Sequence, residues 1–268
     1  ASSASSMSKR GVIARSAGRA AELRAGVEVG GVMFRPDAFG PDALPGADWV
    51  IVLVKAGDTA EAARTALAMG PCGVVSLQNG LTGDVLRAAC GDVPAGQGIT
   101  TEGAFRDGLR VQPSGAGETL LPPGFEAVAS MLQRAGFKAR IEPDIVAARL
   151  VKLLMNLAIN PLAAIFRVTN GALAAPPHRR LLDALVDEAW PVLRAEGLPL
   201  DAAAARERVV AVALATGANR ASMLQDVEAG RRTEIDAITG VFLDMARRHV
   251  VAAPTHQAVF TLVKRLEG

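Results

Sequence analysis

The first half of the chain alternates short apolar runs with amphipathic segments. The continuous β-branched run 49–54 predicts a buried strand, and the short run 12–14 precedes a helix-like segment at 19–24. Further strands are expected at 73–77, 96–101, 109–111 and 119–121, and helices at 58–69 and 84–89. This rhythm of strand and helix predicts a parallel α/β sheet.

One helix start in this half carries a local signal. Asp58 is placed as the N-cap of the helix at 58–69, with Glu61 three residues later as in a capping box. Gly70 and Pro71 are expected to end that helix.

The pattern changes near Pro143, where apolar residues begin to recur every three to four positions. Pro161 is expected to kink or end the first helix. Helices are predicted at 145–160, 178–195, 201–216, 221–249 and 257–266. We therefore expect an N-terminally incomplete, Rossmann-like doubly wound α/β domain over 1–143 and an all-α domain over 144–268.

Composition supports a folded chain of two domains. The 268 residues are 50% hydrophobic, which excludes a disordered chain. The net charge of +2 argues against a nucleic-acid binder. Two cysteines, Cys72 and Cys90, point to a reducing compartment. No apolar run approaches the roughly 20 residues of a membrane span, and residues 1–6 do not read as a signal peptide, so a cytoplasmic protein is expected.

Lysine is rare in this arginine-rich chain. Only five residues are lysine: Lys9, Lys55, Lys138, Lys152 and Lys264. A lysine within an apolar segment is therefore a candidate for chemistry.

Polar residues follow two predicted strands. Lys55 follows the strand at 49–54 and Asn79 follows the strand at 73–77, where doubly wound sheets bind their ligands. A solvated lysine and a simple Asn-Gly turn are the alternatives. Arg15, after the run 12–14, suits the 2′-phosphate of NADP, although arginine is common in this chain.

The segment 150–161 holds the strongest local signal. Lys152, Asn156 and Asn160 share one face of an otherwise apolar helix. Buried amides need partners, so these side chains either bond to other helices or line a cleft with a polar ligand. A partly desolvated lysine in a cleft can donate a proton to a developing alkoxide.

Other polar residues allow two interpretations. Ser222 with Gln225 could form a capping box, and Glu234 could form a surface ion pair with its neighbouring arginines. The three histidines and two cysteines show no metal-ligand spacing, so no metal site and no nucleophilic cysteine is predicted.

Several segments together resemble ketopantoate reductase, also called 2-dehydropantoate 2-reductase. The first half contributes Val54-Lys55-Ala56, Gln78-Asn79-Gly80 and Gly98-Ile-Thr-Thr101. The second half contributes Lys152-Leu-Leu-Met-Asn156-Leu-Ala-Ile-Asn160-Pro161-Leu162, Thr169-Asn170-Gly171, Ser222-Met-Leu-Gln-Asp226, Arg232-Thr-Glu234-Ile-Asp236 and Gly240. The lysine–asparagine segment and the serine–glutamate segment are highly specific at this separation.

The resemblance implies a two-domain NADPH-dependent enzyme with its active site in the interdomain cleft. It would reduce ketopantoate to pantoate in pantothenate and coenzyme A synthesis. By position, Lys152 is the proton donor and Glu234 contacts the cofactor side of the cleft. The substrate's carboxylate and hydroxyl groups would be held by Asn156, Asn160, Asn170, Asn219 and Ser222. The cofactor would be bound by Arg15, Lys55, Asn79 and the backbone at Ala104, and the enzyme would be a monomer or homodimer.

The chain departs from the family pattern at its start. Family members open with an apolar strand and a Gly-x-Gly-x-x-Gly turn, and no such motif exists here. Residues 1–10 are polar and cannot supply that strand. A non-catalytic or impaired relic that keeps the substrate cleft, or a fragment of a normal enzyme, therefore stands beside the active reductase as a hypothesis. A smaller departure is Leu150-Val151, where relatives often carry Trp-Arg.

Overall fold

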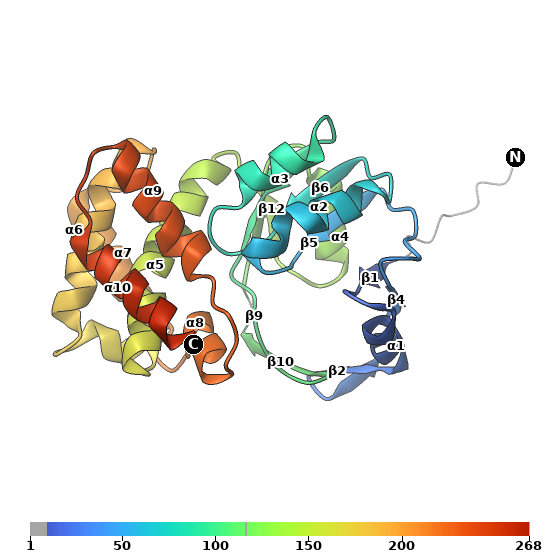
Figure 1. Cartoon of the computed structure of the whole chain (residues 1–268), viewed down its shortest axis with the longest axis horizontal. Helices are drawn as coiled ribbons and strands as arrows, with labels where there is room; N and C mark the ends of the chain where they lie inside the picture. Colours follow the sequence, from blue (N-terminus) through green and yellow to red (C-terminus); the bar gives the residue numbers. More distant parts are fainter. Residues whose placement is uncertain (1–9, 116, 268) are drawn as a thin grey trace, which may run out of the picture.

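The computed structural model describes residues 10–115 and 117–267, which form an α/β half and a helical half side by side (Figure 1). The residues 1–9 that the sequence excluded as a strand lie outside this range. The strands are β1 (Gly11–Ile13), β2 (Val27–Val29), β3 (Val32–Phe34), β4 (Asp37–Phe39), β5 (Trp49–Val52), β6 (Gly73–Ser76), β7 (Ala95–Gln97), β8 (Ile99–Thr100), β9 (Gly103–Asp107), β10 (Arg110–Gly115), β11 (Thr119–Leu121) and β12 (Ala139–Ile141). The helices between them are α1 (Ala17–Ala25), α2 (Thr59–Leu67), α3 (Gly83–Cys90) and α4 (Glu126–Arg134).

The parallel strands form two separate groups. In one sheet β5, β6 and β7 pair in parallel, with Val52 opposite Ser76. In another, β1 and β4 pair in parallel. Among the described residues no strand bonds to both groups. In the doubly wound strand order 3-2-1-4-5-6, the β4–β1 pair corresponds to strands 3 and 2. Strands β5, β6 and β7 correspond to strands 4, 5 and 6.

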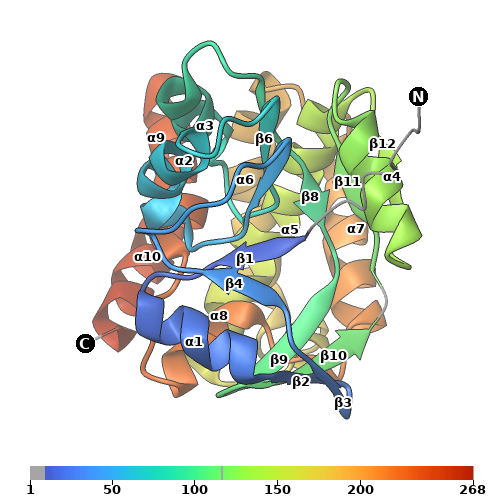
Figure 2. The same ribbon diagram turned by 90° about the vertical axis from the view of Figure 1, so that its right-hand side faces the viewer.

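Two further sheets use contacts between distant segments. The hairpin of β2 and β3 pairs through β2 with β10, which pairs antiparallel with β9, whereas β11 lies between β8 and β12. Figure 2 shows α1 beside β4 and the β9–β10 pair reaching β2. The β2–β10 pairing places Arg110 opposite Glu28, and local hydrophobic patterns do not encode a contact between such distant segments.

The second half is helical around a central helix. Its helices are α5 (Ile145–Phe166), α6 (Arg179–Ala195), α7 (Ala202–Ala215), α8 (Ser222–Glu228), α9 (Val241–Arg248) and α10 (Pro254–Leu266). Leu154, Leu157 and Leu162 of α5 are fully buried, and α5 packs against α6, α7, α8 and α10. The predicted fold class, an α/β region followed by an all-α region, is confirmed.

The sequence predicts that Pro161 kinks or ends the first helix, and the second of these alternatives is wrong. α5 continues through Pro161 to Phe166, with Leu162, Ala163 and Ala164 buried around its last turns. A proline within a helix costs about 3 kcal/mol, and this packing offsets that cost. The uninterrupted helix has 22 residues and is apolar enough to span a membrane by length and composition, contrary to the sequence expectation. However, 67% of its apolar window is buried, as in a core helix.

The predicted single helix over 221–249 is also wrong. α8 ends at Glu228 because Gly230, at φ +60°, allows a left-handed turn. The amide of Arg231 donates to the carbonyl of Asp226, and the amide of Gly230 donates to that of Val227, as in a Schellman motif. A π-helical turn, Asp236–Gly240, then leads into α9. This break produces the loop that carries Glu234.

Asp58 is the N-cap residue of α2, as predicted, but neither capping box forms. The Asp58 side chain makes no cap hydrogen bond, and its carboxylate pairs with Arg15. Ala221 is the N-cap residue of α8, and Gln225 donates instead to the carbonyl of Arg220. Asp58 therefore pairs with a distant residue, whereas Gln225 keeps a local partner.

Candidate active site

Two neighbouring cavities lie where the strand ends meet the helical half. The first is small and is lined by Gln78, Asn79, Gly80, Ile99, Arg149, Lys152, Leu153 and Asn156. The second is larger and more open, and is lined by Leu53, Val54, Lys55, Leu77, Gln78, Asn79 and Glu234. Asn79 lines both, so the predicted strand-end residues and the predicted helical lysine share one site.

Lys152 is the central cation of the first cavity. It projects from α5, and its Nζ donates to the carbonyl oxygen of Thr100 at 2.6 Å. Burial lowers the pKa of Lys152 to about 8, while the negative charge of Glu234 opposes this shift. An ammonium group with a pKa near neutrality suits proton transfer at physiological pH.

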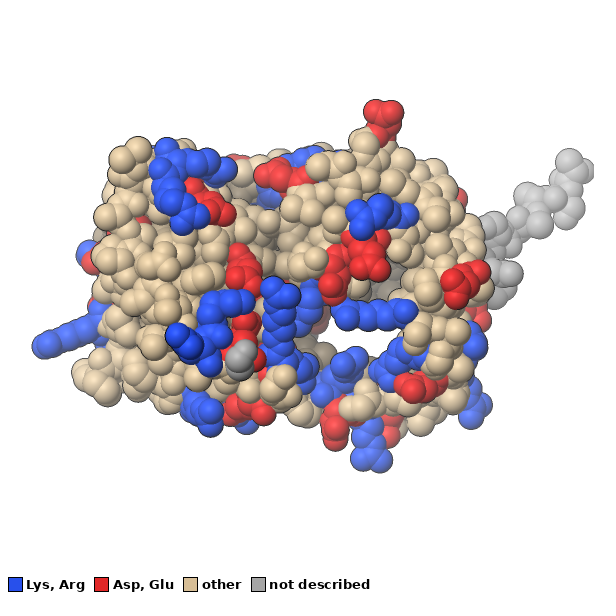
Figure 3. Space-filling model, in the orientation of Figure 1, with Lys and Arg blue, Asp and Glu red and all other residues tan. Residues whose placement is uncertain are grey.

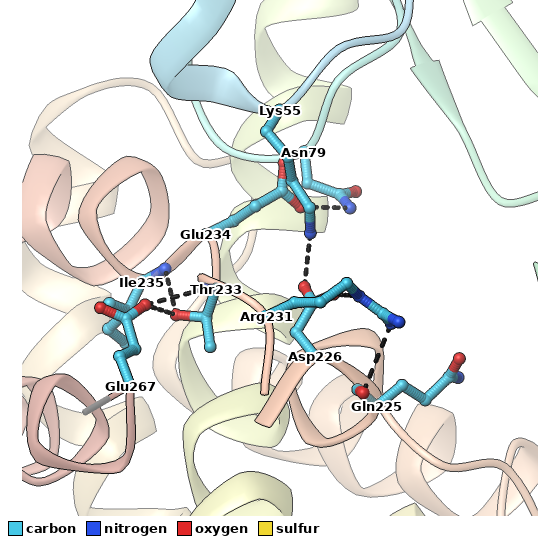
Figure 4. Close-up of polar contacts among 9 residues, drawn as sticks. All are labelled: Lys55, Asn79, Gln225, Asp226, Arg231, Thr233, Glu234, Ile235 and Glu267. Atoms are coloured by element: carbon cyan, nitrogen blue, oxygen red, sulfur yellow. Dashed lines mark hydrogen bonds and ion pairs between the residues drawn. The ribbon is translucent and has the colours of Figure 1, made fainter. Parts of the chain in front are cut away.

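Asn79 and Glu234 connect the two halves across the site. Asn79 follows β6, Glu234 lies in the loop after α8, and the amide Nδ2 donates to Oε2 at 3.0 Å (Figure 4). The alternative of a surface ion pair between Glu234 and its neighbouring arginines is not found among the described salt bridges. The negative charge of Glu234 instead acts on Lys152, whose pKa it raises.

A second connection joins Lys55 to the helical half. The Nζ of Lys55 pairs with Oδ2 of Asp226, and Oδ1 of Asp226 accepts from Nε of Arg231 at 3.0 Å (Figure 4). The Asp226 side chain is only 7% exposed. Asp226 ends the Ser222-Met-Leu-Gln-Asp226 segment, from which the sequence predicts no role for this residue. Its burial and its partner across the cleft depend on tertiary structure.

The loop that carries Glu234 is also held by Thr233 and by Glu267 near the C-terminal end of the described chain. Glu267, after α10, accepts from the backbone amide of Thr233 at 2.8 Å and from its hydroxyl at 2.6 Å. The hydroxyl of Thr233 accepts from the amide of Ile235 (Figure 4). These bonds fix the backbone on both sides of Glu234.

Gln78 holds the two strand ends together. Its Nε2 donates to the carbonyl of Val54 at 2.7 Å, and its Oε1 accepts from the hydroxyl of Ser76 at 2.7 Å. This buried bridge keeps the chain after β5 beside the chain after β6. Lys55 and Asn79 therefore lie at one edge, as the parallel-sheet argument predicts.

The predicted substrate residues lie in two places. Asn156 lines the first cavity, whereas Asn160 is buried one turn further along α5 and lines neither cavity. Asn170 donates from Nδ2 to Thr216 Oγ1 at 2.9 Å, and its backbone amide donates to the carbonyl of Asn219 at 3.0 Å. Asn170 Oδ1 is buried without a partner among the described residues.

The other predicted residues lie nearer the surface. Ser222 is exposed at the first turn of α8. Arg15 is exposed and paired with Asp58, and Ala104 is exposed on β9 opposite Pro113. Figure 3 shows Lys and Arg side chains around a hollow in the middle of the molecule. No cluster of three His, Cys, Asp or Glu side chains able to hold a metal occurs in the part of the chain that the structure describes.

The second cavity lies at the carboxyl ends of two neighbouring parallel strands. Lys55 and Asn79 sit beyond the carboxyl ends of β5 and β6, where doubly wound sheets bind nucleotides. The Gly-x-Gly-x-x-Gly turn that usually binds the pyrophosphate does not occur within these 268 residues. A doubly wound sheet with polar groups at its strand ends, next to a buried lysine, is the arrangement expected of a nicotinamide-dependent oxidoreductase.

Comparison with known proteins identifies the family within this class. The profile "Ketopantoate reductase PanE/ApbA" matches residues 7–124, and its C-terminal counterpart matches residues 144–267. The chain belongs to the ketopantoate reductase family, which confirms the resemblance found in the sequence.

Individual relatives agree with this assignment. A 2-dehydropantoate 2-reductase of Pyrobaculum aerophilum is 34% identical over 223 residues, covering 82% of this chain and 77% of that protein. One of Halobacterium salinarum is 36% identical and covers 84% and 77%.

Solved structures share the fold. A probable 2-dehydropantoate 2-reductase of Bacillus subtilis matches with a TM-score of 0.79 and 27% identity, covering 96% of this chain and 92% of that one. A D-mandelate dehydrogenase, solved with NADH and anilino(oxo)acetate, matches with a TM-score of 0.86 and 21% identity, covering 96% and 90%. At that identity it supports the fold alone.

Proposed function

We propose that this protein reduces 2-dehydropantoate to pantoate with NADPH, a step of pantothenate and coenzyme A synthesis. The observation that carries the proposal is the buried Lys152, with a pKa lowered to about 8, in a cavity shared with Asn79. In this proposal residues 1–143 form the cofactor domain and residues 144–268 form the substrate and catalytic domain.

Lys152 acts as the proton donor in the proposed reaction. NADPH, when bound, supplies the hydride to the 2-oxo carbon. Lys152 then neutralises the developing alkoxide by donating its proton to the former carbonyl oxygen. Glu234 supports this role because its charge favours the protonated form of Lys152. The contact of Glu234 with Asn79 also orders the cofactor side of the site.

The substrate's polar groups are assigned to the helical half. Asn156 lies in the same cavity as Lys152 and is the nearest of these candidates. Asn160, Asn170, Asn219 and Ser222 complete the proposed set, and the unpartnered Oδ1 of Asn170 is available to accept a hydroxyl donor.

The cofactor contacts are assigned to the sheet half. Lys55 and Asn79 line the second cavity, and the backbone at Ala104 and the side chain of Arg15 extend the proposed contacts along the dinucleotide. We favour NADPH over NADH because an arginine after β1 suits a 2′-phosphate. That phosphate would replace Asp58 as the anionic partner of Arg15.

The test is turnover with a matched lysine control. We expect the purified protein to oxidise NADPH when 2-dehydropantoate is added. We expect Lys152→Met to lower kcat by at least about 100-fold, because general acid catalysis contributes about 10² to 10⁴. Lys138→Met, at an exposed lysine, should leave kcat unchanged. No turnover in the wild type, or full activity in Lys152→Met, contradicts the proposal.

We further infer a cytoplasmic protein that is a monomer or homodimer. The relatives named 2-dehydropantoate 2-reductase support a small 2-oxo acid as the proposed partner. Light scattering across a range of protein concentrations distinguishes monomer from dimer, and a higher oligomer would contradict this inference.

A further inference from the structure

Arg149 is a second cation of the Lys152 cavity. It lies three residues before Lys152 on α5 and, with Lys152 and Asn156, lines the first cavity. Residues three apart on a helix are neighbours on one face. One helical face therefore presents a guanidinium, an ammonium and an amide to the same small space.

Few hydrogen-bond partners are available to Arg149. Its Nε is buried and has no partner among the described residues. Its Nη1 lies 3.4 Å from Oε1 of Gln97. That oxygen already accepts the amides of Thr82 at 3.0 Å and Gly83 at 2.9 Å, so the third contact is weak. A guanidinium carries five donors, and most of them have no protein acceptor here.

The charge of Arg149 is also uncompensated. Within residues 10–115 and 117–267 no carboxylate forms a salt bridge with it. Burial and then the positive charge of Arg87 lower the pKa of Arg149, and Asp84 only partly opposes this. A partly buried cation without a paired anion is costly. An anionic ligand would relieve that cost.

We propose that Arg149 binds the carboxylate of the 2-oxo acid while Lys152 contacts the adjacent ketone oxygen. This assignment rests on the proposed function. A 2-oxo acid carries its carboxylate and ketone on neighbouring carbons, which matches two cations one helical turn apart. Arginine binds carboxylates through two parallel hydrogen bonds, which fixes the orientation of the ketone. Arg149 thereby selects 2-oxo acids over uncharged ketones.

A purely structural role makes different predictions. Arg149 lies against Gly83 at the start of α3, where an added Cβ would be 2.9 Å from Nη1. If the guanidinium only braces α3, its loss should reduce stability and affect all substrates equally. The deciding measurement therefore compares a charged and an uncharged substrate.

The experiment uses Arg149→Gln and Arg149→Lys with Arg134→Gln as an exposed control. The substrates are 2-dehydropantoate and its lactone, which has the same ketone without the carboxylate. We expect Arg149→Gln to raise KM for the acid by about tenfold or more, since hydrogen bonds to charged groups contribute about 1.5–3 kcal/mol. KM for the lactone should change by less than about twofold. Arg149→Lys should be intermediate, and Arg134→Gln should match the wild type.

Binding of oxamate, followed by tryptophan fluorescence, separates this proposal from the proposed function. If the wild type reduces neither compound, the proposed function fails. Oxamate binding that is lost only in Arg149→Gln still supports the assignment. Equal KM increases for acid and lactone, or equal oxamate binding in wild type and Arg149→Gln, overturn it. If Arg149→Gln does not fold, the acid-to-lactone comparison in Arg149→Lys decides.

Discussion

At the scale of single residues, the site depends on a lysine whose charge is finely balanced. Burial lowers the pKa of Lys152, and Glu234 raises it, to give about 8. Asn79 holds Glu234 in place from the opposite half. The proposed proton donor, the carboxylate that raises its pKa and the amide that holds this carboxylate therefore come from three separate segments of the chain.

This balance predicts the pH dependence of the reaction. A proton donor must be protonated, so kcat/KM should fall as pH rises through about 8. Glu234→Gln removes the group that raises the pKa of Lys152, so its decline should begin at lower pH. Initial rates from pH 6 to pH 10, on the order of one point per half unit, measure the shift. Glu207→Gln, at an exposed site on α7, is the control. An unshifted profile in Glu234→Gln would separate Glu234 from Lys152.

The turn after Asn79 requires glycine at position 80. Its φ is +74°, and an added Cβ would lie 2.3 Å from the carbonyl oxygen of Ala237 in the π-helical turn. We predict that Gly80→Ala lowers the free energy of unfolding by about 2 kcal/mol or more and weakens the Asn79–Glu234 contact.

Gly70→Ala is the matched control for this substitution. Its φ is +66°, but nothing lies within 4 Å of the added Cβ, so it carries only the backbone cost of about 1 kcal/mol. Urea unfolding of both variants compares the two costs. Equal losses of stability would mean that the close approach of Gly80 to Ala237 is unimportant.

At the scale of elements, long helices in the second half are shaped by buried polar contacts as well as apolar packing. Glu188 of α6 accepts the amides of Thr255 and His256 at the start of α10, and its carboxylate also contacts His256 Nδ1 at 3.1 Å. The His256 ring stacks on Phe242 and is fully buried. This contact joins α6, α9 and α10.

The buried ring predicts acid sensitivity. Burial lowers the pKa of His256 from 6.5 to about 4, with Glu188 opposing the shift. The folded state therefore resists protonation, and stability is lost as pH falls from about 6.5 toward 4, by about 3 kcal/mol at most. His256→Leu should show a smaller loss between pH 7 and pH 5 in urea unfolding, on the order of half that of the wild type. His249→Gln is the control, and identical pH dependence in all three proteins would contradict the prediction.

Elements with a strong local signal were predictable, and those defined by distant partners were not. β5 and β6 follow from their apolar runs, so Lys55 and Asn79 could be placed at one edge. The passage of α5 through Pro161 depends on burial by other helices. The break at Gly230 had a visible signal, a glycine that permits a left-handed turn, but the apolar periodicity obscured it. Arg149 had no local signal, because its lack of partners is a property of the folded site.

At the scale of the whole molecule, the sheet half is divided. The β1–β4 pair and the β5–β6–β7 sheet share no strand among the described residues. The Gly-x-Gly-x-x-Gly turn that presents a helix N-terminus to the pyrophosphate in dinucleotide folds does not occur within these 268 residues. Lys and Arg side chains lie around the central hollow (Figure 3).

This arrangement predicts weak cofactor binding by the 268-residue chain. Placing an apolar strand and a Gly-x-Gly-x-x-Gly turn ahead of Gly11 should lower the Kd for NADPH by about tenfold or more, since an anion at a helix N-terminus gains up to about 2 kcal/mol. The same graft with valine in place of the three glycines is the control. Fluorescence titration measures each Kd, and equal values for all three proteins would show that the turn is dispensable.

The contact between Lys55 and Asp226 ties cofactor binding to the relative position of the two halves. One ammonium group serves both as the bridge to the helical half and as a candidate partner for a phosphate. A phosphate that takes Lys55 leaves the carboxylate of Asp226 buried with Arg231 as its remaining partner. The contribution of Lys55 to the binding free energy of an anionic ligand is thus the free energy of its contact with the ligand minus that of its contact with Asp226. Conditions that weaken the ion pair between Lys55 and Asp226 should therefore raise the affinity of Lys55 for an anionic ligand.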